Sequence, residues 1–269
     1  MPTLETQGIS LYYELHGEPS APPVLLITGL GGVGRSWGEQ VQRFADSHYV
    51  VLPDQRGTGQ TTHAQDGYTT QQLAEDMAAL VEHLRLGPVH VVGASTGGAI
   101  AQYLALEHAE IVRSLTISSS FARFDPFLRR EFEIRSKMAA EWDRHTLMSA
   151  YSLFLIGPRF THDHPDRVSQ WIERAASNPS GPADREIELK RIDMIAAHDA
   201  YDRLSEIRAP TLVTCGTHNF CTTLALSEEI AARIPGAELV IFDDAGELIE
   251  FEQPEKYFQT VSRFIDSHS

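Results

Sequence analysis

Residues 89–107 read VHVVGASTGGAIAQYLALE, and this stretch decides the fold class. It opens with a β-branched run typical of a buried strand and closes with helix-forming residues from Ala99 to Glu107. Between them, Gly93-Ala94-Ser95-Thr96-Gly97-Gly98 matches the pattern G-x-S-x-G. The glycines permit a turn so tight that Ser95 would be strained and exposed at the positive end of the helix. This setting predicts a nucleophilic serine; the alternative is a glycine-rich turn that only packs helix on strand.

The chain on both sides of this motif alternates short β-branched runs with longer segments of helical period. Such alternation is typical of a mostly parallel sheet with helices on both faces, so we predict an α/β fold. One predicted helix begins at a capping box formed by Thr69 and Gln72, and another follows Pro254. The predicted strands are Ser10–Leu15, Val24–Thr28, Tyr49–Pro53, Val89–Gly93, Val112–Ser118, Thr211–Cys215 and Glu238–Phe242.

The segment from residue 121 to residue 204 departs from this alternation. It has no convincing strand, and its charged, aromatic and Pro/Gly-punctuated stretches predict several helices. Insertions at the carboxyl edge of a parallel sheet tend to lie over the ligand crevice. We therefore predict a core domain of residues 1–120 and 205–269 and a helical cap, or lid, of residues 121–204.

The composition is that of an ordinary globular chain of 269 residues, 42% of them hydrophobic and 22% charged. A formal net charge of −15 would repel phosphate backbones and anionic membranes, so we expect no nucleic acid and no membrane partner. The N-terminal residues lack the basic and apolar regions of a secretory signal, which favours the cytoplasm. Cys215 and Cys221 lack zinc-finger spacing and are expected to be reduced thiols. We expect a small-molecule substrate and neither a metal nor a cofactor. A homodimer is one of the oligomeric states that the sequence leaves open.

Four segments carry a resemblance to the α/β-hydrolase fold superfamily along nearly the whole chain. They are LLITGLGGVGRSW (25–37), PDQRGTGQT (53–61), AYDRLSEIRAPTLVTCGTHNF (200–220) and DDAGELIEFEQPEKYF (243–258). The nearest resemblance is to small carbon-carbon, enol-lactone and aminoacrylate hydrolases of catabolic pathways. The resemblance implies that the backbone N–H groups of Leu30 and Thr96 form an oxyanion hole for a carbonyl oxygen.

Two positions depart from the pattern of that superfamily. The acid position, usually the Asp of G-x-x-D, holds Asn219, and the histidine position of G-H-x-x-x-x-E-x-P holds Glu247. Glu252 and Pro254 keep the register, so only Ser95 remains of a Ser-His-Asp triad. A glutamate with an ordinary pKa near 4.3 is a weaker base than histidine by about two units. The replacements fit each other, because the Asn219 amide can donate to a Glu247 carboxylate where an aspartate would repel it.

Other residues are weaker candidates for the missing triad members. Asp125 could supply a carboxylate, although a helix-capping charge before Pro126 is the simpler interpretation. His218 could turn inward, although a solvent-facing loop histidine is the simpler one. His162 and His164 form an H-x-H pair without a nearby third ligand, which favours a solvated loop over a metal site.

The predicted cap supplies candidates for substrate contact. A cap arginine could clamp a substrate carboxylate, although most should be surface charges; the candidates are Arg123, Arg129, Arg130 and Arg135. Aromatic and apolar residues in the motif segments and at the start of the predicted cap suggest the wall of a substrate pocket. The substrate-binding candidates are Gly29, Trp37, Phe121, Phe124, Asp125 and Leu248.

These residues support three functional hypotheses for a site that would take a small to medium, largely apolar carbonyl compound. The first is non-hydrolytic acid/base chemistry (isomerisation, cyclisation or elimination) in specialised metabolism, with Glu247 moving the proton. The second is hydrolysis of an ester, lactone or carbon-carbon bond by Ser95 with Glu247 as base. The third is a ligand-binding pseudoenzyme. Asn219 and Glu247 could also be recent or engineered replacements in an ordinary triad.

Overall fold

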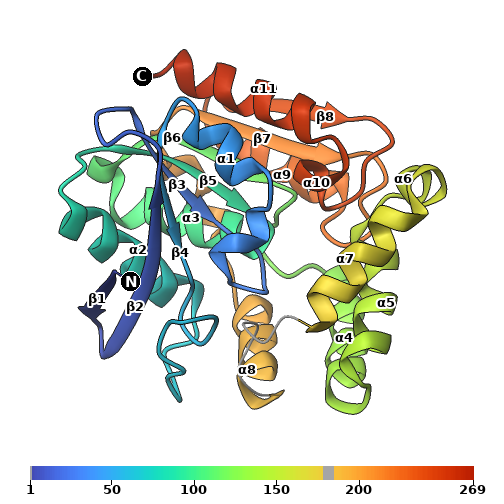
Figure 1. The fold of residues 1–269 in the computed structure, drawn as a ribbon. Helices are drawn as coiled ribbons and strands as arrows, with labels where there is room; N and C mark the ends of the chain where they lie inside the picture. The colour runs from blue at the N-terminus through green and yellow to red at the C-terminus, as the bar shows by residue number, and fades with distance from the viewer. Residues whose placement is uncertain (1, 178–184) are drawn as a thin grey trace.

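An eight-stranded sheet forms the centre of the computed structural model, which describes residues 2–177 and 185–269 (Figure 1). The strand order is β1-β2-β4-β3-β5-β6-β7-β8, with β1 and β2 antiparallel to their neighbours and the other six strands mutually parallel. The strands are β1 (Thr3–Thr6), β2 (Ile9–His16), β3 (Pro23–Ile27), β4 (Tyr49–Pro53), β5 (Val89–Ala94), β6 (Val112–Ser118), β7 (Thr211–Gly216) and β8 (Glu238–Phe242). The mostly parallel α/β architecture expected from the sequence is confirmed.

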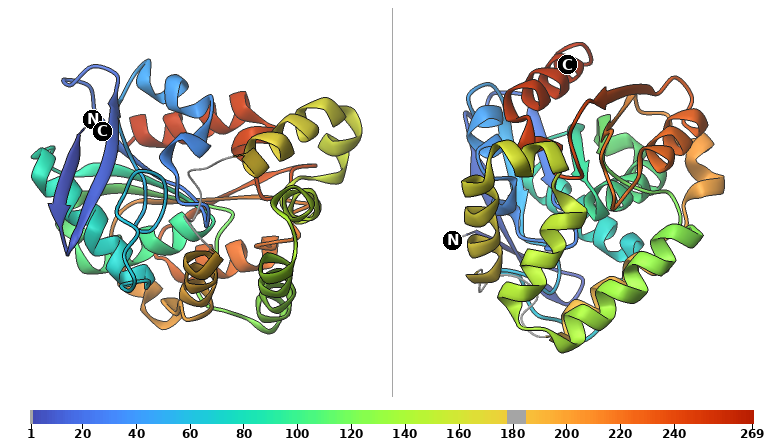
Figure 2. Two further views of the ribbon diagram at one scale, coloured as in Figure 1. Left: turned by 60° about the horizontal axis from the view of Figure 1, so that its bottom comes forward. Right: turned by 90° about the vertical axis from the view of Figure 1, so that its right-hand side faces the viewer.

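Helices cover both faces of this sheet and divide the apolar core into two main clusters (Figures 1 and 2). Helices α1 (Gln40–Ala45) and α11 (Pro254–Asp266) pack on one face, against the cluster that contains Phe44 and Tyr257. The opposite face carries α2 (Thr70–Leu84), α3 (Thr96–Glu107) and α9 (Leu224–Arg233). The short elements are η1 (Gly34–Trp37), η2 (Ala109–Ile111), η3 (Tyr201–Glu206) and α10 (Ile249–Glu252). No helix among the described residues is long and apolar enough to cross a bilayer.

Five helices occupy the described part of the chain between β6 and η3, and the figures show them gathered to one side of the sheet (Figures 1 and 2). They are α4 (Pro126–Glu141), α5 (Arg144–Leu155), α6 (Pro158–Asp163), α7 (Pro165–Ser177) and α8 (Arg185–Ala196). The segments that enter and leave this region pair, because the Ala200 N–H donates to the Ala122 carbonyl at 2.8 Å. We call residues 121–204 the cap; its residues 178–184 lie outside the described part, and the division into two domains stays a prediction.

Strand β1 is an addition that the sequence pattern does not indicate. Its four residues, TLET, alternate between exposed and half-buried and carry no β-branched apolar side chain. The strand forms by antiparallel pairing with β2 at the edge of the sheet, from Thr3 opposite Tyr12 to Thr6 opposite Ile9. A short polar segment of this kind becomes a strand because a neighbour offers a free edge, which local sequence does not reveal.

Candidate active site

Ser95 lies at the sharp turn between β5 and α3, as the G-x-S-x-G motif predicts. Its backbone has φ 53° and ψ −120°, a conformation that costs energy for any residue with a Cβ. The turn is held by the Ser95 N–H, which donates to the Ser118 carbonyl at the end of β6 at 2.8 Å. Ser95 is therefore half-buried, directly before the first residue of α3, where unpaired helix N–H groups create a positive potential.

Glu247 is the buried carboxylate of this site, with 2% of its surface exposed. Its Oε2 accepts from the Asn219 Nδ2 at 2.7 Å, from the Thr222 Oγ1 at 2.6 Å and from the Thr222 N–H at 3.2 Å. Among the described residues, its Oε1 has no partner of standard hydrogen-bond geometry. The structure thus makes the Asn219–Glu247 contact that the sequence analysis expects and leaves one carboxylate oxygen without a fixed partner.

Burial raises the pKa of Glu247 above its ordinary value. Hydrogen bonds from Thr222, Ser95 and Asn219 favour the charged form and offset part of that rise. The Ser95 hydroxyl lies close enough to the carboxylate to be one of these groups, so Ser95 and Glu247 face each other. A carboxylate with a raised pKa is a stronger base than an exposed glutamate, which brings its basicity closer to that of histidine.

Sequence reasoning missed Thr222, which gives Glu247 two of its three hydrogen bonds to Oε2. Thr222 lies three residues beyond Asn219, in a loop where no motif singles it out. The Asn219 side chain shapes this loop, since its Oδ1 accepts from the Cys221 N–H at 3.0 Å. Thr222 therefore joins Asn219 and Glu247 in one hydrogen-bonded cluster.

The two proposed oxyanion donors belong to segments next to Ser95. Thr96 begins α3, and Leu30 follows Gly29, at which an added Cβ would lie 3.2 Å from the Ser95 Cβ. In residues 2–177 and 185–269, neither the Leu30 N–H nor the Thr96 N–H donates to another protein group. Both amides therefore have no protein acceptor, as an oxyanion donor requires, and their role in an oxyanion hole stays a prediction.

Three of the weaker triad candidates have structural partners instead. Asp125 caps α4, with its Oδ1 accepting from the Leu128 N–H at 2.7 Å, which is the simpler interpretation given above. His218 lies 3.6 Å from the Asp244 carboxylate, and His162 is exposed and contacts Asp163. Within the described residues, no group of three or more His, Cys, Asp or Glu side chains could hold a metal ion. Cys215 and Cys221 are both free and buried.

The aromatic and apolar candidates for substrate contact lie in different parts of the core and the cap. Phe121 is buried in the larger apolar cluster and makes an edge-to-face contact with Phe124, with ring centroids 6.0 Å apart. Leu248 follows Glu247 and is anchored by its N–H to the Leu155 carbonyl of the cap at 3.1 Å. Trp37 is buried in the α1/α11 core cluster and packs on Tyr257, and its expected place in a pocket wall stays a prediction.

The cap arginines also have defined surroundings. Arg123 donates to Glu229 at 2.7 Å and lies over the Tyr201 ring, while Arg129 and Arg130 are exposed. Arg135 is buried, and its Nη1 contacts the Glu131 Oε1 and the Cys221 Sγ, each at 3.2 Å. The Arg135 side chain therefore links α4 to the loop that carries Asn219.

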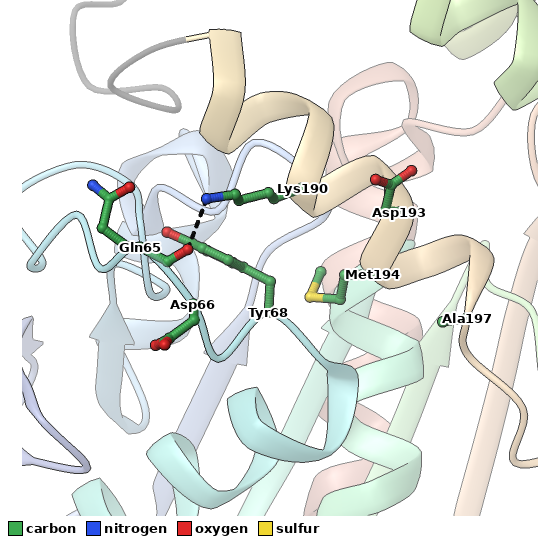
Figure 3. Close-up of a pocket in the computed structure, with 7 residues that line it drawn as sticks. All are labelled: Gln65, Asp66, Tyr68, Lys190, Asp193, Met194 and Ala197. Carbon is green, nitrogen blue, oxygen red and sulfur yellow. Dashed lines mark hydrogen bonds between the residues drawn. The ribbon is translucent and has the colours of Figure 1, made fainter.

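A surface pocket of about 330 Å³ lies away from these residues, between the segment of residues 65–68 and helix α8 (Figure 3). The Lys190 side chain extends toward Gln65 in this pocket, and its Nζ donates to the Gln65 carbonyl at 2.8 Å. The lining residues are Gln65, Asp66, Tyr68, Lys190, Asp193, Met194 and Ala197. None of them is a predicted site residue, so we do not assign the chemistry to this pocket.

Comparisons with known proteins agree with the fold and the motifs. A family model described as the alpha/beta hydrolase fold matches residues 22–254, and the chain belongs to this family of enzymes. A relative from Azorhizobium caulinodans, named "Putative carbamate hydrolase RutD", is 33% identical over 243 residues, which are 90% of each chain. The enol-lactonase from Burkholderia xenovorans is 26% identical and has a TM-score of 0.87, covering 98% of this chain and 100% of that one. The deep-sea metagenome enzyme MGS-M2 has a TM-score of 0.91 at 20% identity, covering 98% of this chain and 97% of its own, and shows likeness of fold alone.

Proposed function

We propose that the protein is a serine hydrolase for a small, uncharged, activated carbonyl compound such as an activated ester or an enol lactone, with Ser95 as nucleophile and Glu247 as base. One observation carries the proposal: a buried carboxylate faces the Ser95 hydroxyl and has one oxygen without a fixed partner. Asn219 and Thr222 hold the other oxygen, so the orientation of the carboxylate is fixed. A base that is itself oriented by a third group is the arrangement of an activated nucleophile.

The proposed reaction has two stages. The Ser95 Oγ attacks the carbonyl carbon while its proton moves to Glu247, and the Leu30 and Thr96 N–H groups bind the resulting oxyanion. The oxyanion collapses, the bond to the leaving group breaks, and the proton on Glu247 passes to the leaving atom. Water then attacks the acyl-serine and gives a proton to Glu247; the bond between the acyl carbon and the Ser95 Oγ breaks, the proton passes from Glu247 to that Oγ, and the acid is released.

The character of the base restricts the substrate. A carboxylate takes the serine proton less readily than an imidazole does, so the carbonyl should be activated by a good leaving group or ring strain. A protonated carboxyl group is, in turn, a stronger acid than an imidazolium, so Glu247 can protonate the leaving group. The buried negative charge of Glu247 and the apolar cluster around Phe121 and Phe124 would disfavour an anionic substrate.

Hydrolysis displaces the non-hydrolytic chemistry that the sequence analysis places first. The matched RutD proteins are named hydrolases, and the Burkholderia protein is named an enol-lactonase. These names describe a carbamate and an enol lactone as substrates of the relatives, and the enolate released from an enol lactone is a stabilised leaving group. They support hydrolysis here as the better of the two hypotheses for the same residues.

Labelling with a fluorophosphonate probe tests the proposal directly. We expect the wild-type protein to gain one phosphonate, located on Ser95 by peptide mass spectrometry, because the probe needs both an activated serine and an oxyanion hole. The Ser95→Ala variant should gain none. A wild-type protein that stays unlabelled while consuming a carbonyl substrate would favour the non-hydrolytic hypothesis, and tight binding without turnover would favour the pseudoenzyme.

The Thr222→Val variant tests how Glu247 is tuned. The Thr222 hydroxyl lowers the pKa of Glu247, so its removal should raise that pKa further. Because the base acts as a carboxylate, the labelling rate of Ser95 falls as pH drops through this pKa, and the fall should begin at higher pH in Thr222→Val. At alkaline pH the rate should change by less than about tenfold, since the backbone N–H of Thr222 remains. Thr222→Ser, which keeps the hydroxyl, should retain the wild-type profile; identical profiles in all three proteins would contradict the assignment of Glu247.

A further inference from the structure

Arg191 of helix α8 is a fully buried cation in which every recorded hydrogen bond goes to a neutral acceptor. The Nε and Nη2 atoms donate to the Leu30 carbonyl at 3.0 Å and 2.9 Å. The Nη1 atom donates to the Arg56 carbonyl at 2.8 Å, and Nη2 also donates to the Gln55 Oε1 at 2.6 Å. Burial lowers the pKa of Arg191 to about 10, so the group stays charged at neutral pH.

These bonds converge on the loop of residues 28–32, which carries the proposed oxyanion donor Leu30. Arg191 fixes the peptide that follows Leu30, because it holds the Leu30 carbonyl in a two-pronged contact. The peptide that precedes Leu30 contains the Leu30 N–H and the Gly29 carbonyl, and that carbonyl accepts from the Gly32 N–H at 3.0 Å. Both peptide planes on either side of Leu30 are thus held in place.

Gln55 continues the same network to the start of the loop. Its Oε1 accepts from Arg191, its Nε2 donates to the Thr28 carbonyl at 2.7 Å, and its backbone N–H donates to the Gly32 carbonyl at 2.8 Å. The packing is tight, since a Cβ on Gly32 would lie 2.8 Å from the Arg191 Nη2. With four of its five N–H donors engaged by the protein and no exposed surface, Arg191 is not an anchor for a substrate anion.

We propose that Arg191 is a positioning residue: a guanidinium carried by the cap sets the Leu30 peptide, so that the oxyanion hole is assembled only while α8 is docked on the core. The inference rests on the proposed function, because it concerns the same oxyanion hole. The physical reason is that an oxyanion donor acts through its orientation, and an error of about 1 Å in such a group can cost 10²-fold in rate. Arg191 reaches no reacting atom and acts through Leu30.

Two substitutions of Arg191 distinguish its contacts with the Leu30 carbonyl from its positive charge. Arg191→Met removes both, and Arg191→Lys keeps the charge but lacks the planar fork that holds the Leu30 carbonyl twice. We expect the maximal rate of Ser95 labelling to fall about 10²-fold in Arg191→Met, and nearly as far in Arg191→Lys, with the probe concentration for half-maximal rate little changed. Asp193→Asn, which removes an exposed charge on the same helix, should label at the wild-type rate.

Hydrogen exchange provides a readout that does not depend on activity. The peptide covering residues 28–34 should exchange faster in both Arg191 variants than in wild type and Asp193→Asn, while the strands keep their protection. A wild-type protein that fails to label would overturn the proposed function, and exchange would then decide the positioning role alone. Folded Arg191 variants with the wild-type labelling rate and wild-type exchange would overturn the inference.

A second variant decides the outcome if the Arg191 variants do not fold. Gln55→Glu keeps an acceptor for the guanidinium, which should preserve the fold, but it removes the donor to the Thr28 carbonyl. We expect labelling to slow about tenfold and the exchange of residues 28–34 to rise. A folded Gln55→Glu protein that matches wild type in both measurements would refute the positioning network.

Discussion

The Glu247→Gln variant should lose turnover of an activated ester or lactone by about 10³-fold to 10⁴-fold, since the loss of a general base beside a serine costs of this order. Glutamine has the shape of glutamate, so the contacts to Asn219 and Thr222 can be kept by its amide oxygen. What it lacks is the ability to accept the Ser95 proton. The residual rate should also lose its dependence on pH in the acidic range, because the titrating group is gone. Steady-state kinetics between about pH 5 and 8 measures both effects.

Asp244→Asn is the matched control for this experiment. Asp244 lies in the same loop and carries the same charge, but its side chain is 66% exposed and lies 3.6 Å from His218. We expect kcat/KM and the pH profile of this variant to be those of wild type. Glu247→Gln with wild-type turnover, or an equal loss in Asp244→Asn, would show that Glu247 is not the base. A protein whose wild-type rate is flat in acid would lead to the same conclusion.

The Gly97→Ala variant should be the most destabilising change at the Ser95 turn, with the free energy of unfolding reduced by about 4 kcal/mol or more. An added Cβ at residue 97 would lie 2.1 Å from the Ile27 carbonyl oxygen and 2.5 Å from that of Thr28. Both atoms belong to the backbone at the end of β3, so neither can move aside without shifting the strand. Urea unfolding followed by circular dichroism gives the difference, and failure to fold would be the extreme of the same result.

Gly31→Ala is the control for glycine replacement as such. An added Cβ at Gly31 meets no atom within 4 Å, and its backbone is outside the positive-φ region. Its stability should stay within about 0.5 kcal/mol of wild type or rise slightly, because alanine restricts the unfolded chain. If Gly97→Ala were as stable as Gly31→Ala, the close approach of α3 to β3 described above would be incorrect.

The sequence predicted the sheet because each parallel strand contains a short β-branched run, and such runs are recognisable one at a time. All seven predicted strands are present, with bounds that differ by at most a few residues. The strand it missed, β1, forms through pairing at an edge and carries no such run. The packing of Trp37 on Tyr257 of α11 was not predictable for a related reason, because an aromatic residue near a glycine-rich loop can face a pocket or the core.

Candidate site residues could be proposed from the sequence where a motif fixes their position. They could not be proposed where they depend on contacts between residues far apart in the chain. Ser95, Asn219 and Glu247 occupy positions set by flanking residues, so their chemistry could be compared with a known pattern. Thr222 and Arg191 belong to no motif. Whether they matter depends on which side chains the folded chain places next to Glu247 and Leu30.

The sequence by itself determined the α/β-hydrolase fold and the strained turn at Ser95, and it led to the prediction that Asn219 and Glu247 stand at the acid and histidine positions. These follow from local patterns of glycine, β-branched and charged residues. Only the tertiary structure decided that Thr222 fixes Glu247 and that Arg191 holds the Leu30 loop. The second contact joins residues 161 positions apart and is made by a side chain excluded from water. Its existence depends on how the cap packs on the core, and no local pattern encodes that packing.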